Sequence, residues 1–249
     1  MALNKLTDSG FLGVAEWHST SLDDYREWVK KISGKSQKPI FRGQRRYWPL
    51  LPRVTGDVPR GTILKNEKRL LDEFKKKAPL CLQVVPSNDL DWLVVAQHHS
   101  LPTRLLDWTY NPYVALWFAF EKSDKNDSGP EVWMLKTSED EHVPSLEDVR
   151  PFSGNRTKVF KPSFLIPRVK AQEGCFTLFK YIEKSQKGFV PLERNVALRK
   201  RLMRIRMANY SRDRILKELS RMGYNKSRFF PDIDEVAREV KELVLRVRA

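Results

Sequence analysis

The sequence has only two cysteines, Cys81 and Cys175, and four histidines among its 249 residues. Two cysteines cannot form a disulfide framework, and no Cys/His spacing typical of zinc is present, so we expect two buried thiols and no metal site. No apolar run approaches the roughly 18 residues needed to cross a bilayer. The start of the chain lacks the basic and apolar regions of a secretory signal. These absences predict a cytoplasmic protein without a membrane anchor.

Low-complexity segments and internal repeats are also lacking, which argues against fibrous and disordered classes. Hydrophobic residues make up 41% of the chain and charged residues 31%. A chain of this length and composition can bury a sizeable core, and its length favours one large domain. We therefore expect a single folded domain.

Acidic residues are scarce relative to basic ones, at 31 against 46, which gives a net charge of +15. Much of the excess lies after residue 194, and its densest run is Arg199-Lys200-Arg201-Leu202-Met203-Arg204-Ile205-Arg206. This alternation is typical of a half-buried strand or a short amphipathic helix. A basic face of this kind is either simply solvated or attracts a polyanion. The candidate nucleic-acid contacts are Arg45, Arg46, Arg199, Lys200, Arg201 and Arg204.

Hydrophobic spacing and capping residues predict the order of the secondary structure. Helices are expected at 15–32, 64–78, 88–99, 112–122, 211–222 and 233–247, and strands at 39–44, 103–109, 131–135, 164–170 and 174–180. The helix at 112–122 is apolar nearly all round, so we expect it to be deeply buried. Short strands between long helices, without a regular βαβ repeat, favour an α+β fold.

Two segments carry a recognisable pattern. They are Phe41-Arg42-Gly43-Gln44 and the run from Gln97 to Thr109, Gln-His-His-Ser-Leu-Pro-Thr-Arg-Leu-Leu-Asp-Trp-Thr, which Asn111-Pro112 follows. Together they resemble the FRG domain, a family named for its Phe-Arg-Gly motif. The resemblance spans about residues 38–240, with 1–37 as a helical lead-in and 241–249 as the end of the last helix.

The order of these motifs is also similar to the Arg-Ser-Glu class of ADP-ribosyltransferases. That resemblance implies an ADP-ribosyltransferase-like mixed β core in which Arg42 binds the phosphates of NAD and Thr109 braces the nicotinamide pocket. It places the catalytic acidic position at Gln172 or Glu173, where a carboxylate holds the ribose hydroxyl while nicotinamide leaves. The remaining residues that it assigns to NAD binding are Gly43, Gln44, Thr103, Arg104 and Trp108.

The chemistry suits these residue types. Cleavage of an N-glycosidic bond builds positive charge on the ribose, which a nearby carboxylate stabilises. The planar fork of Arg42 can bind two phosphate oxygens, and Gly43 would let a ligand approach the backbone. Two questions stay open. Arg42 either binds phosphate or is a structural partner of a carboxylate such as Asp107. Asp107 either pairs with Arg104 or Arg42, or acts as a general base that activates the acceptor. His98 is a further acid–base candidate, or a histidine that favours a helix end.

The resemblance implies an NAD-dependent ADP-ribosyltransferase that acts on a macromolecular acceptor, with nucleic acid favoured by the basic charge. Small proteins of this kind look like toxins or phage-defence effectors, which an antitoxin or regulatory protein would hold in check. Two other classes remain as alternatives. One is a non-catalytic nucleic-acid-binding module, and the other is a nuclease that uses Asp107 and His98, although no carboxylate cluster with metal spacing is visible.

Overall fold

The computed structural model describes residues 5–6, 13–33, 38–57, 62–124, 129–163, 166–183, 185 and 188–245. The strands are β1 (Lys5–Leu6), β2 (Ala15–Ser19), β3 (Pro39–Gln44), β4 (Leu105–Thr109), β5 (Glu131–Lys136), β6 (Lys158–Phe160), β7 (Gly174–Leu178) and β8 (Leu202–Met207). The α-helices are α1 (Leu22–Ile32), α2 (Val54–Asp57), α3 (Ile63–Lys77), α4 (Asp89–His98), α5 (Pro112–Glu121), α6 (Pro167–Ala171), α7 (Arg212–Arg221), α8 (Lys226–Phe229) and α9 (Ile233–Leu245). Short 3-10 turns occur at Ala78–Cys81, Glu139–Glu141, Leu192–Arg194, Arg199–Arg201 and Asn209–Ser211.

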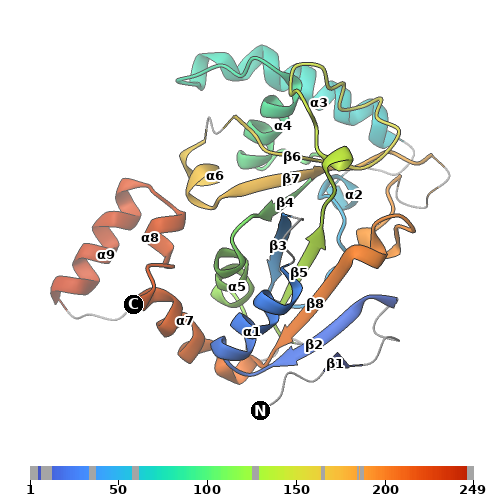
Figure 1. Cartoon of the computed structure of the whole chain (residues 1–249). Helices are drawn as coiled ribbons and strands as arrows, with labels where there is room; N and C mark the ends of the chain where they lie inside the picture. The colour runs from blue at the N-terminus through green and yellow to red at the C-terminus, as the bar shows by residue number, and fades with distance from the viewer. Residues whose placement is uncertain are drawn as a thin grey trace.

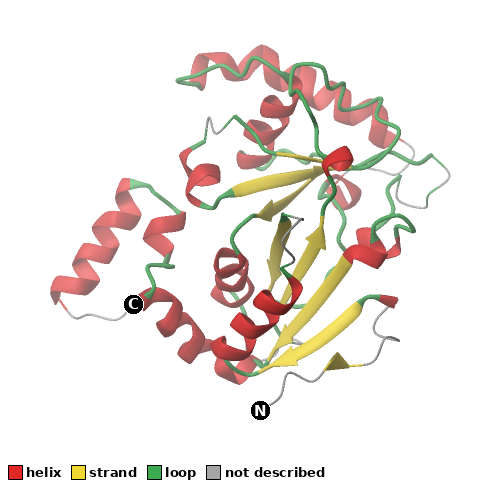
Figure 2. Ribbon diagram, in the orientation of Figure 1, coloured by secondary structure: helices red, strands yellow, loops and turns green. Residues whose placement is uncertain are grey.

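The strands form one mixed sheet in the order β1-β2-β8-β5-β3-β4-β7-β6 (Figures 1 and 2). The β2–β8 pair is parallel, and the other pairs between these strands are antiparallel. Mixed strands with helices gathered outside them confirm the expected α+β fold class.

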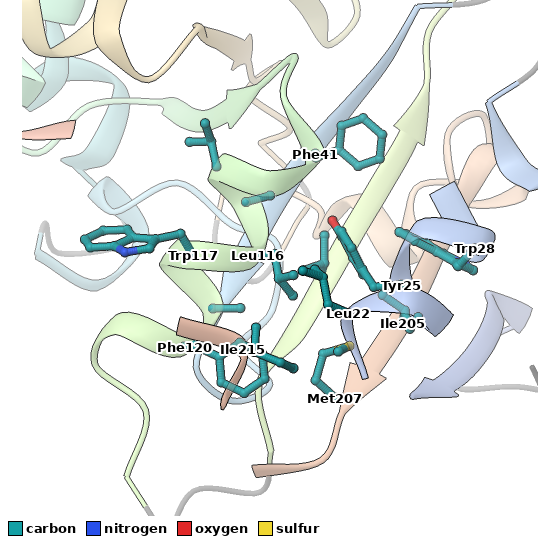
Figure 3. Close-up of a cluster of buried hydrophobic side chains, with 14 of the residues drawn as sticks. Leu22, Tyr25, Trp28, Phe41, Leu116, Trp117, Phe120, Ile205, Met207 and Ile215 are labelled. Atoms are coloured by element: carbon teal, nitrogen blue, oxygen red, sulfur yellow. The ribbon is translucent and has the colours of Figure 1, made fainter. Parts of the chain in front are cut away.

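Helix α5 packs on one face of the central strands with α1 and α7 beside it (Figure 3). The side chain of Asn111 accepts from the N–H groups of Tyr113 and Val114, and Pro112 takes the first position of the helix. Apolar residues surround α5, so it buries side chains in several directions. The buried members of α5 are Val114, Ala115, Leu116, Trp117, Ala119 and Phe120, which confirms the predicted deep burial.

Two further clusters of buried apolar residues complete the core, the first on the opposite face of the sheet and the second on the same face as α5. One lies over β3, β5 and β8, around Ile40, Trp133 and Leu202. The other joins α3 and α4 to β6 and β7, where Trp92 packs edge-on against Phe74 and Phe160 stacks on Phe176. The two ends of the sheet are thus covered by different helices, and the line between them falls at β3 and β4.

Three expectations from the sequence are wrong. Residues 15–19 are strand β2 and not the first turns of a helix, because they pair with β8; the helix begins after Ser21, whose side chain accepts from the N–H of Asp24. Within 164–170, residues 167–170 are helical and not strand, since Pro167 starts α6. Cys81 is exposed, whereas Cys175 is buried as expected. Among the residues that the structure describes, no helix is long and apolar enough to span a bilayer.

Candidate functional site

Strands β3 and β4 separate almost as soon as they meet. Strand β3 pairs with β5 along its full length from Pro39 to Gln44, but with β4 only at Phe41 and Thr109. Strand β4 in turn pairs with β7 along Leu105–Thr109. A cleft of about 880 Å³ opens in the fork between β3 and β4, within the usual range for small-molecule sites of about 300–1,000 Å³.

The cleft draws its walls from several parts of the chain. Its lining includes residues 41–45 of β3 and the turn after it, residues 105–109 of β4, the end of α4 at Gln97 and His98, and Arg168 and Gln172 of the α6 turn. Its ionisable residues are five cations, Arg42, Arg45, Arg53, Lys122 and Arg168, two carboxylates, Asp107 and Glu121, and His98. This excess of cations suits an anionic ligand.

Arg42 spans the fork. Its Nη1 donates to the backbone carbonyl of Asp107 at 2.8 Å and lies 3.8 Å from the Asp107 carboxylate. Burial lowers the pKa of Arg42, and the neighbouring Asp107 carboxylate opposes that shift. The Arg42 side chain therefore bridges β3 and β4 across the fork, mainly through the main chain of Asp107.

Two buried polar atoms of β3 lack a hydrogen-bond partner within the described part of the chain. They are Nε of Arg42, a donor, and Oε1 of Gln44, an acceptor, two residues further along the same strand. Both residues line the cleft, and Gln44 is only 5% exposed. A buried polar atom without a partner costs about 1–3 kcal/mol, so this pair of atoms suits a ligand that offers both an acceptor and a donor.

Gly43 serves the packing of α5. A Cβ on Gly43 would lie 1.8 Å from the backbone oxygen of Ala115 and 2.7 Å from the backbone nitrogen of Ala119. The close approach of the helix therefore requires a glycine here, and the same residue also lines the cleft.

Asp107 is held from the end of α4. Gln97 Nε2 donates to Asp107 Oδ1 at 2.8 Å, and the side-chain oxygen Oε1 of Gln97 accepts from the hydroxyl of Thr103. Thr103 in turn accepts from the N–H of Leu105 at the start of β4. The Asp107 side chain is 63% exposed, so its carboxylate is fixed by Gln97 yet open to the cleft.

Arg168 and His98 form the wall contributed by α6 and the end of α4. The Arg168 guanidinium lies 4.1 Å from the ring centre of Phe230. Burial lowers the pKa of Arg168, and the charges of Asp107, Glu121 and Asp232 oppose that shift. The pKa of His98 is lowered by burial, by His99 and by Arg168, so its imidazole favours the neutral form.

The two residues expected at the acidic position separate. Gln172 lines the cleft, where its Nε2 donates to the carbonyl of Phe229 at 3.1 Å and its own carbonyl accepts from the Thr109 hydroxyl at 2.7 Å. Glu173, with φ of 49°, turns the chain into β7, and its Oε1 accepts from Asn111 at 2.8 Å. Glu173 is not among the residues that line the cleft.

The remaining residues assigned to NAD binding lie at different depths. Trp108 and Thr109 line the cleft, and Trp108 donates from Nε1 to Thr177 at 3.2 Å. Arg104 is 1% exposed and outside the cleft lining, and it forms a two-pronged ion pair with the buried Glu67. Arg104 therefore joins β4 to α3, and it is not the partner of Asp107.

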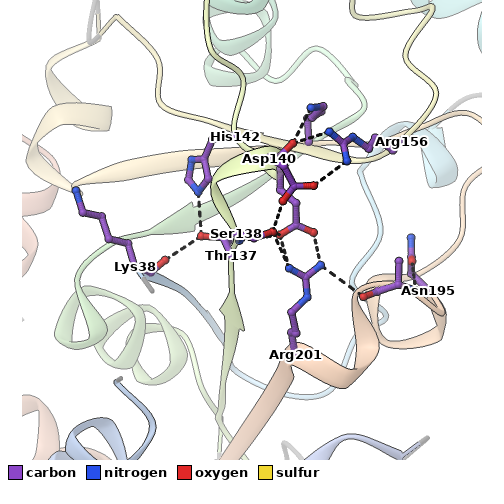
Figure 4. A network of polar contacts seen from close by, with 11 residues as sticks. Lys38, Thr137, Ser138, Asp140, His142, Arg156, Asn195 and Arg201 are labelled. Carbon is purple, nitrogen blue, oxygen red and sulfur yellow. Dashed lines mark hydrogen bonds and ion pairs between the residues drawn. The ribbon is translucent and has the colours of Figure 1, made fainter. Parts of the chain in front are cut away.

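The basic run at residues 199–206 is divided between the surface and the interior. Arg201 forms an ion pair with Glu141, the last residue of the 3-10 turn Glu139–Glu141. Figure 4 shows the surrounding polar network, which also includes Ser138. Arg204 is 5% exposed and pairs with Glu16 and Glu131. Arg199 and Lys200 are exposed. Two of the four expected nucleic-acid contacts in this run are thus committed to ion pairs.

The first pair of expected nucleic-acid contacts lies near the cleft instead. Arg45 lines the cleft and donates to the carbonyl of Lys122 at the end of α5. Arg46 is exposed, and both guanidinium groups lie against the ring of Trp48, at 5.4 and 4.8 Å from its centre. These two residues are close to the same ring, which itself lines the cleft.

A comparison with protein-family models identifies part of the chain. Residues 37–128 match the model of the FRG domain. The chain carries an FRG domain. No curated protein and no solved structure matches the chain. The FRG match includes Arg42, Gln97 and Asp107, whereas the resemblance noted beyond residue 128 stays a prediction.

The FRG domain supplies most of the cleft but not all of it. Its matched residues contain β3, α4, β4 and α5, whereas Arg168 and Gln172 lie outside the match and close the fork from α6. Sequence reasoning did not select Gln97, Arg168 or Trp48 as site residues. Gln97 could have been found as the first residue of the long motif, and Arg168 by its place four residues before Gln172.

The described ranges contain no candidate metal-binding site. They contain no group of three or more His, Cys, Asp or Glu side chains placed to hold a metal ion. The nuclease alternative, which would use Asp107 and His98, therefore has no metal-binding group in this part of the chain to support it.

Proposed function

We propose that the cleft of this FRG domain binds NAD and that the protein transfers ADP-ribose to a macromolecular acceptor. The observation that carries the proposal is the pair of partnerless buried atoms, Arg42 Nε and Gln44 Oε1, on the wall of a cationic cleft. A phosphate oxygen is the natural acceptor for Arg42. A carboxamide or amino group is the natural donor for Gln44. NAD carries both groups.

Cations on two sides of the cleft support a pyrophosphate between them. Arg42 enters from β3 and Arg168 from α6. The negative charge of Asp107 opposes the lowering of the pKa of both arginines by burial. A pyrophosphate would replace part of that single carboxylate interaction with two charge-assisted contacts. Guanidinium groups suit this role because they stay charged even when burial lowers their pKa.

Asp107 is the carboxylate that we assign to the chemistry. In the transfer, the bond between the ribose C1′ and the nicotinamide nitrogen breaks, and its electron pair leaves with nicotinamide. The acceptor nucleophile bonds to C1′, and its proton passes to a base. Asp107 is exposed to the cleft and oriented by Gln97, so it can stabilise the developing positive charge on the ribose or take that proton.

The acceptor that fits the charge of the protein is a nucleic acid. A net charge of +15 attracts polyanions over long distances and favours nucleic acid over an acidic protein patch of small size. A protein that attaches ADP-ribose to the nucleic acid of its own cell would act as a toxin or as an antiviral effector, and an antitoxin or regulatory protein would hold it inactive.

A second candidate has one specific observation in its favour. Glu173, the carboxylate in the position where the motif order calls for one, lies outside the cleft lining and hydrogen-bonds Asn111. Without a carboxylate at that position, the domain would bind a nucleotide and recognise nucleic acid without cleaving NAD. The two candidates share the cleft and differ in turnover.

The test is NAD binding by calorimetry and nicotinamide release by chromatography, with wild type, Arg42→Ala, Asp107→Asn and Glu173→Gln. We expect Arg42→Ala to weaken binding at least tenfold, and Asp107→Asn to bind NAD but release nicotinamide about 100-fold more slowly. Glu173→Gln is the matched carboxylate control and should behave as wild type. Thermal unfolding of each variant verifies the fold.

The outcomes separate the candidates. Binding without release by wild type would favour the non-catalytic module. Loss of release in Glu173→Gln but not in Asp107→Asn would move the catalytic carboxylate to Glu173. If the folded wild-type protein does not bind NAD at all, the proposed function is wrong.

A further inference from the structure

Trp48 is an exception among the tryptophans. Of the seven in the chain, six have relative exposures of 6% or less, whereas Trp48 is 40% exposed. It lies four residues after the end of β3 and lines the same cleft as Arg42 and Asp107. A large aromatic ring left partly in water at the edge of a cleft loses the benefit of burial, so its position needs a reason other than packing.

Two arginines accompany this ring. The guanidinium carbons of Arg45 and Arg46 lie 5.4 and 4.8 Å from the centre of the Trp48 ring, within the range of cation–π contacts. Arg53, five residues after Trp48 in the sequence, is exposed and also lines the cleft. The ring therefore offers an apolar face beside groups that bind phosphate.

The segment that carries Trp48 is fixed on both sides. Tyr47 donates its hydroxyl to Glu193 at 3.1 Å, and the N–H of Leu50 donates to the other oxygen of Glu193 at 3.1 Å. The Glu193 side chain is fully buried, and the carbonyl of Leu50 accepts from the N–H of Leu192. Pro49 further restricts the backbone between them. Stacking of a ligand on Trp48 therefore costs little conformational entropy, because the segment that carries the ring is already ordered.

We infer that Trp48, with Arg45 and Arg46, forms a stacking site for a base of a single-stranded nucleic acid at the mouth of the cleft. The inference rests on the proposed function, for which it names the acceptor as a single strand and gives its point of attachment. An unpaired base offers a face to an aromatic ring, while neighbouring arginines contact the phosphates and stack as well.

The geometry favours a single strand over the other polyanions. A duplex keeps its bases stacked inside, so it would meet the arginines but could not use the ring. An acidic peptide would likewise use the charges alone. The exposed ring is thus the feature that distinguishes the ligands, and its removal is the decisive change.

The experiment measures fluorescence anisotropy of labelled oligonucleotides of about ten nucleotides, a usual single-strand site size. Single-stranded RNA, single-stranded DNA and a duplex are titrated with wild type, Trp48→Ala, Trp48→Phe and Lys200→Ala. We expect wild type to bind a single strand more tightly than the duplex. Trp48→Ala should weaken single-strand binding by about five- to 100-fold, and Trp48→Phe should retain most of it, because stacking needs a ring.

Lys200→Ala tests the competing contact in the C-terminal basic run, because Lys200 is an exposed cation that does not line the cleft. Its effect should be less than about threefold on any oligonucleotide. Comparison of the RNA and DNA titrations identifies which of the two strands is preferred. Since Trp48→Phe keeps the size and shape of an aromatic side chain, it also tests the inference if Trp48→Ala does not fold.

The results separate this inference from the proposed function. Single-strand binding that depends on Trp48, in a protein that does not bind NAD, would uphold the stacking site and refute the NAD proposal. Release of nicotinamide, together with equal binding of single strand and duplex by wild type and Trp48→Ala, would do the reverse. Absence of binding to either single strand, or a larger effect of Lys200→Ala than of Trp48→Ala, would overturn the stacking site.

Discussion

The guanidinium of Arg42 donates to the main-chain carbonyl of Asp107 at 2.8 Å, across the fork where β3 and β4 have stopped pairing. The side chain of Arg42 thus makes a hydrogen bond to the main chain of β4 where backbone pairing between β3 and β4 has ended. The same arginine keeps its Nε buried on the cleft wall, without a hydrogen-bond partner among the residues that the structure describes. One residue therefore both braces the fork and offers a donor to a ligand, so its two roles can be separated by substitution.

Arg42→Lys should separate these roles. A lysine keeps the charge and can still reach one acceptor, but it cannot bridge to Asp107 and bind two phosphate oxygens at once. We expect NAD affinity to fall at least tenfold in calorimetry, with little change in the urea midpoint. Arg156→Lys is the control, because Arg156 pairs with Asp140 outside the cleft. A lysine variant with wild-type affinity would contradict a two-oxygen contact.

Gly43→Ala and Gly56→Ala should change stability in opposite directions. A Cβ on Gly43 would collide with the backbone of Ala115, and backbone atoms cannot move aside cheaply. We expect a loss of about 1–3 kcal/mol or more. Gly56 lies in α2 with nothing within 4 Å of its added Cβ, so Gly56→Ala should gain up to about 1 kcal/mol. Urea denaturation measures both, and equal losses would show that α5 does not press on β3.

Arg104→Met should strongly destabilise the fold by leaving Glu67 buried without its cation. The usual cost of breaking a buried pair is about 3–5 kcal/mol. Burial already raises the pKa of Glu67, and loss of Arg104 removes the main influence that lowers it. A carboxylate with a raised folded-state pKa is protonated more readily in the native protein, so the loss should shrink as pH falls from about 8 to about 5.

The double variant Glu67→Leu/Arg104→Met tests the same prediction from the other side. Because both charges are gone, much of the lost free energy of unfolding should return, and the pH dependence of the difference should disappear. A double variant as unstable as Arg104→Met alone would mean that packing around the pair, and not the stranded charge, causes the loss.

His98 should make the fold more sensitive to acid. Its pKa is lowered by burial, His99 and Arg168, so the unfolded chain binds a proton more readily than the native protein does. Stability linked to His98 is therefore present above its unfolded pKa of about 6.5, and is lost as pH falls from there towards the lower native value. His98→Asn should lose less stability than wild type over this interval in thermal unfolding. Parallel pH curves for the two proteins would refute the assignment.

Local signals predicted several elements well. Helix α5 follows from Asn111-Pro112 and an apolar sequence, because a cap, a proline at the first position and burial all favour the same structure. Helix α3 and strand β5 lie close to their predicted ranges, 64–78 and 131–135. In each case the local preference and the tertiary environment agree.

Other elements depended on partners far away in the sequence. Residues 15–19 pair with β8, which follows nearly 190 residues later, and this ladder overrides the helical pattern predicted for 15–32. The run 199–206 divides into a 3-10 turn and strand β8, because Leu202 and Ile205 enter the core while Arg204 finds Glu16 and Glu131. A charge count alone could not show which arginines are paired inside.

The sequence by itself determined the FRG motifs, the positive charge and the identities of Arg42 and Asp107, because these are local facts of composition and order. Only the tertiary structure decided that β3 and β4 part after one residue pair, that Gln172 lines the resulting cleft and that Glu173 does not. A one-residue step along the turn after α6 reverses the direction of a side chain, and strand separation depends on the packing of distant helices. Such choices arise from contacts between remote segments, which no local pattern encodes.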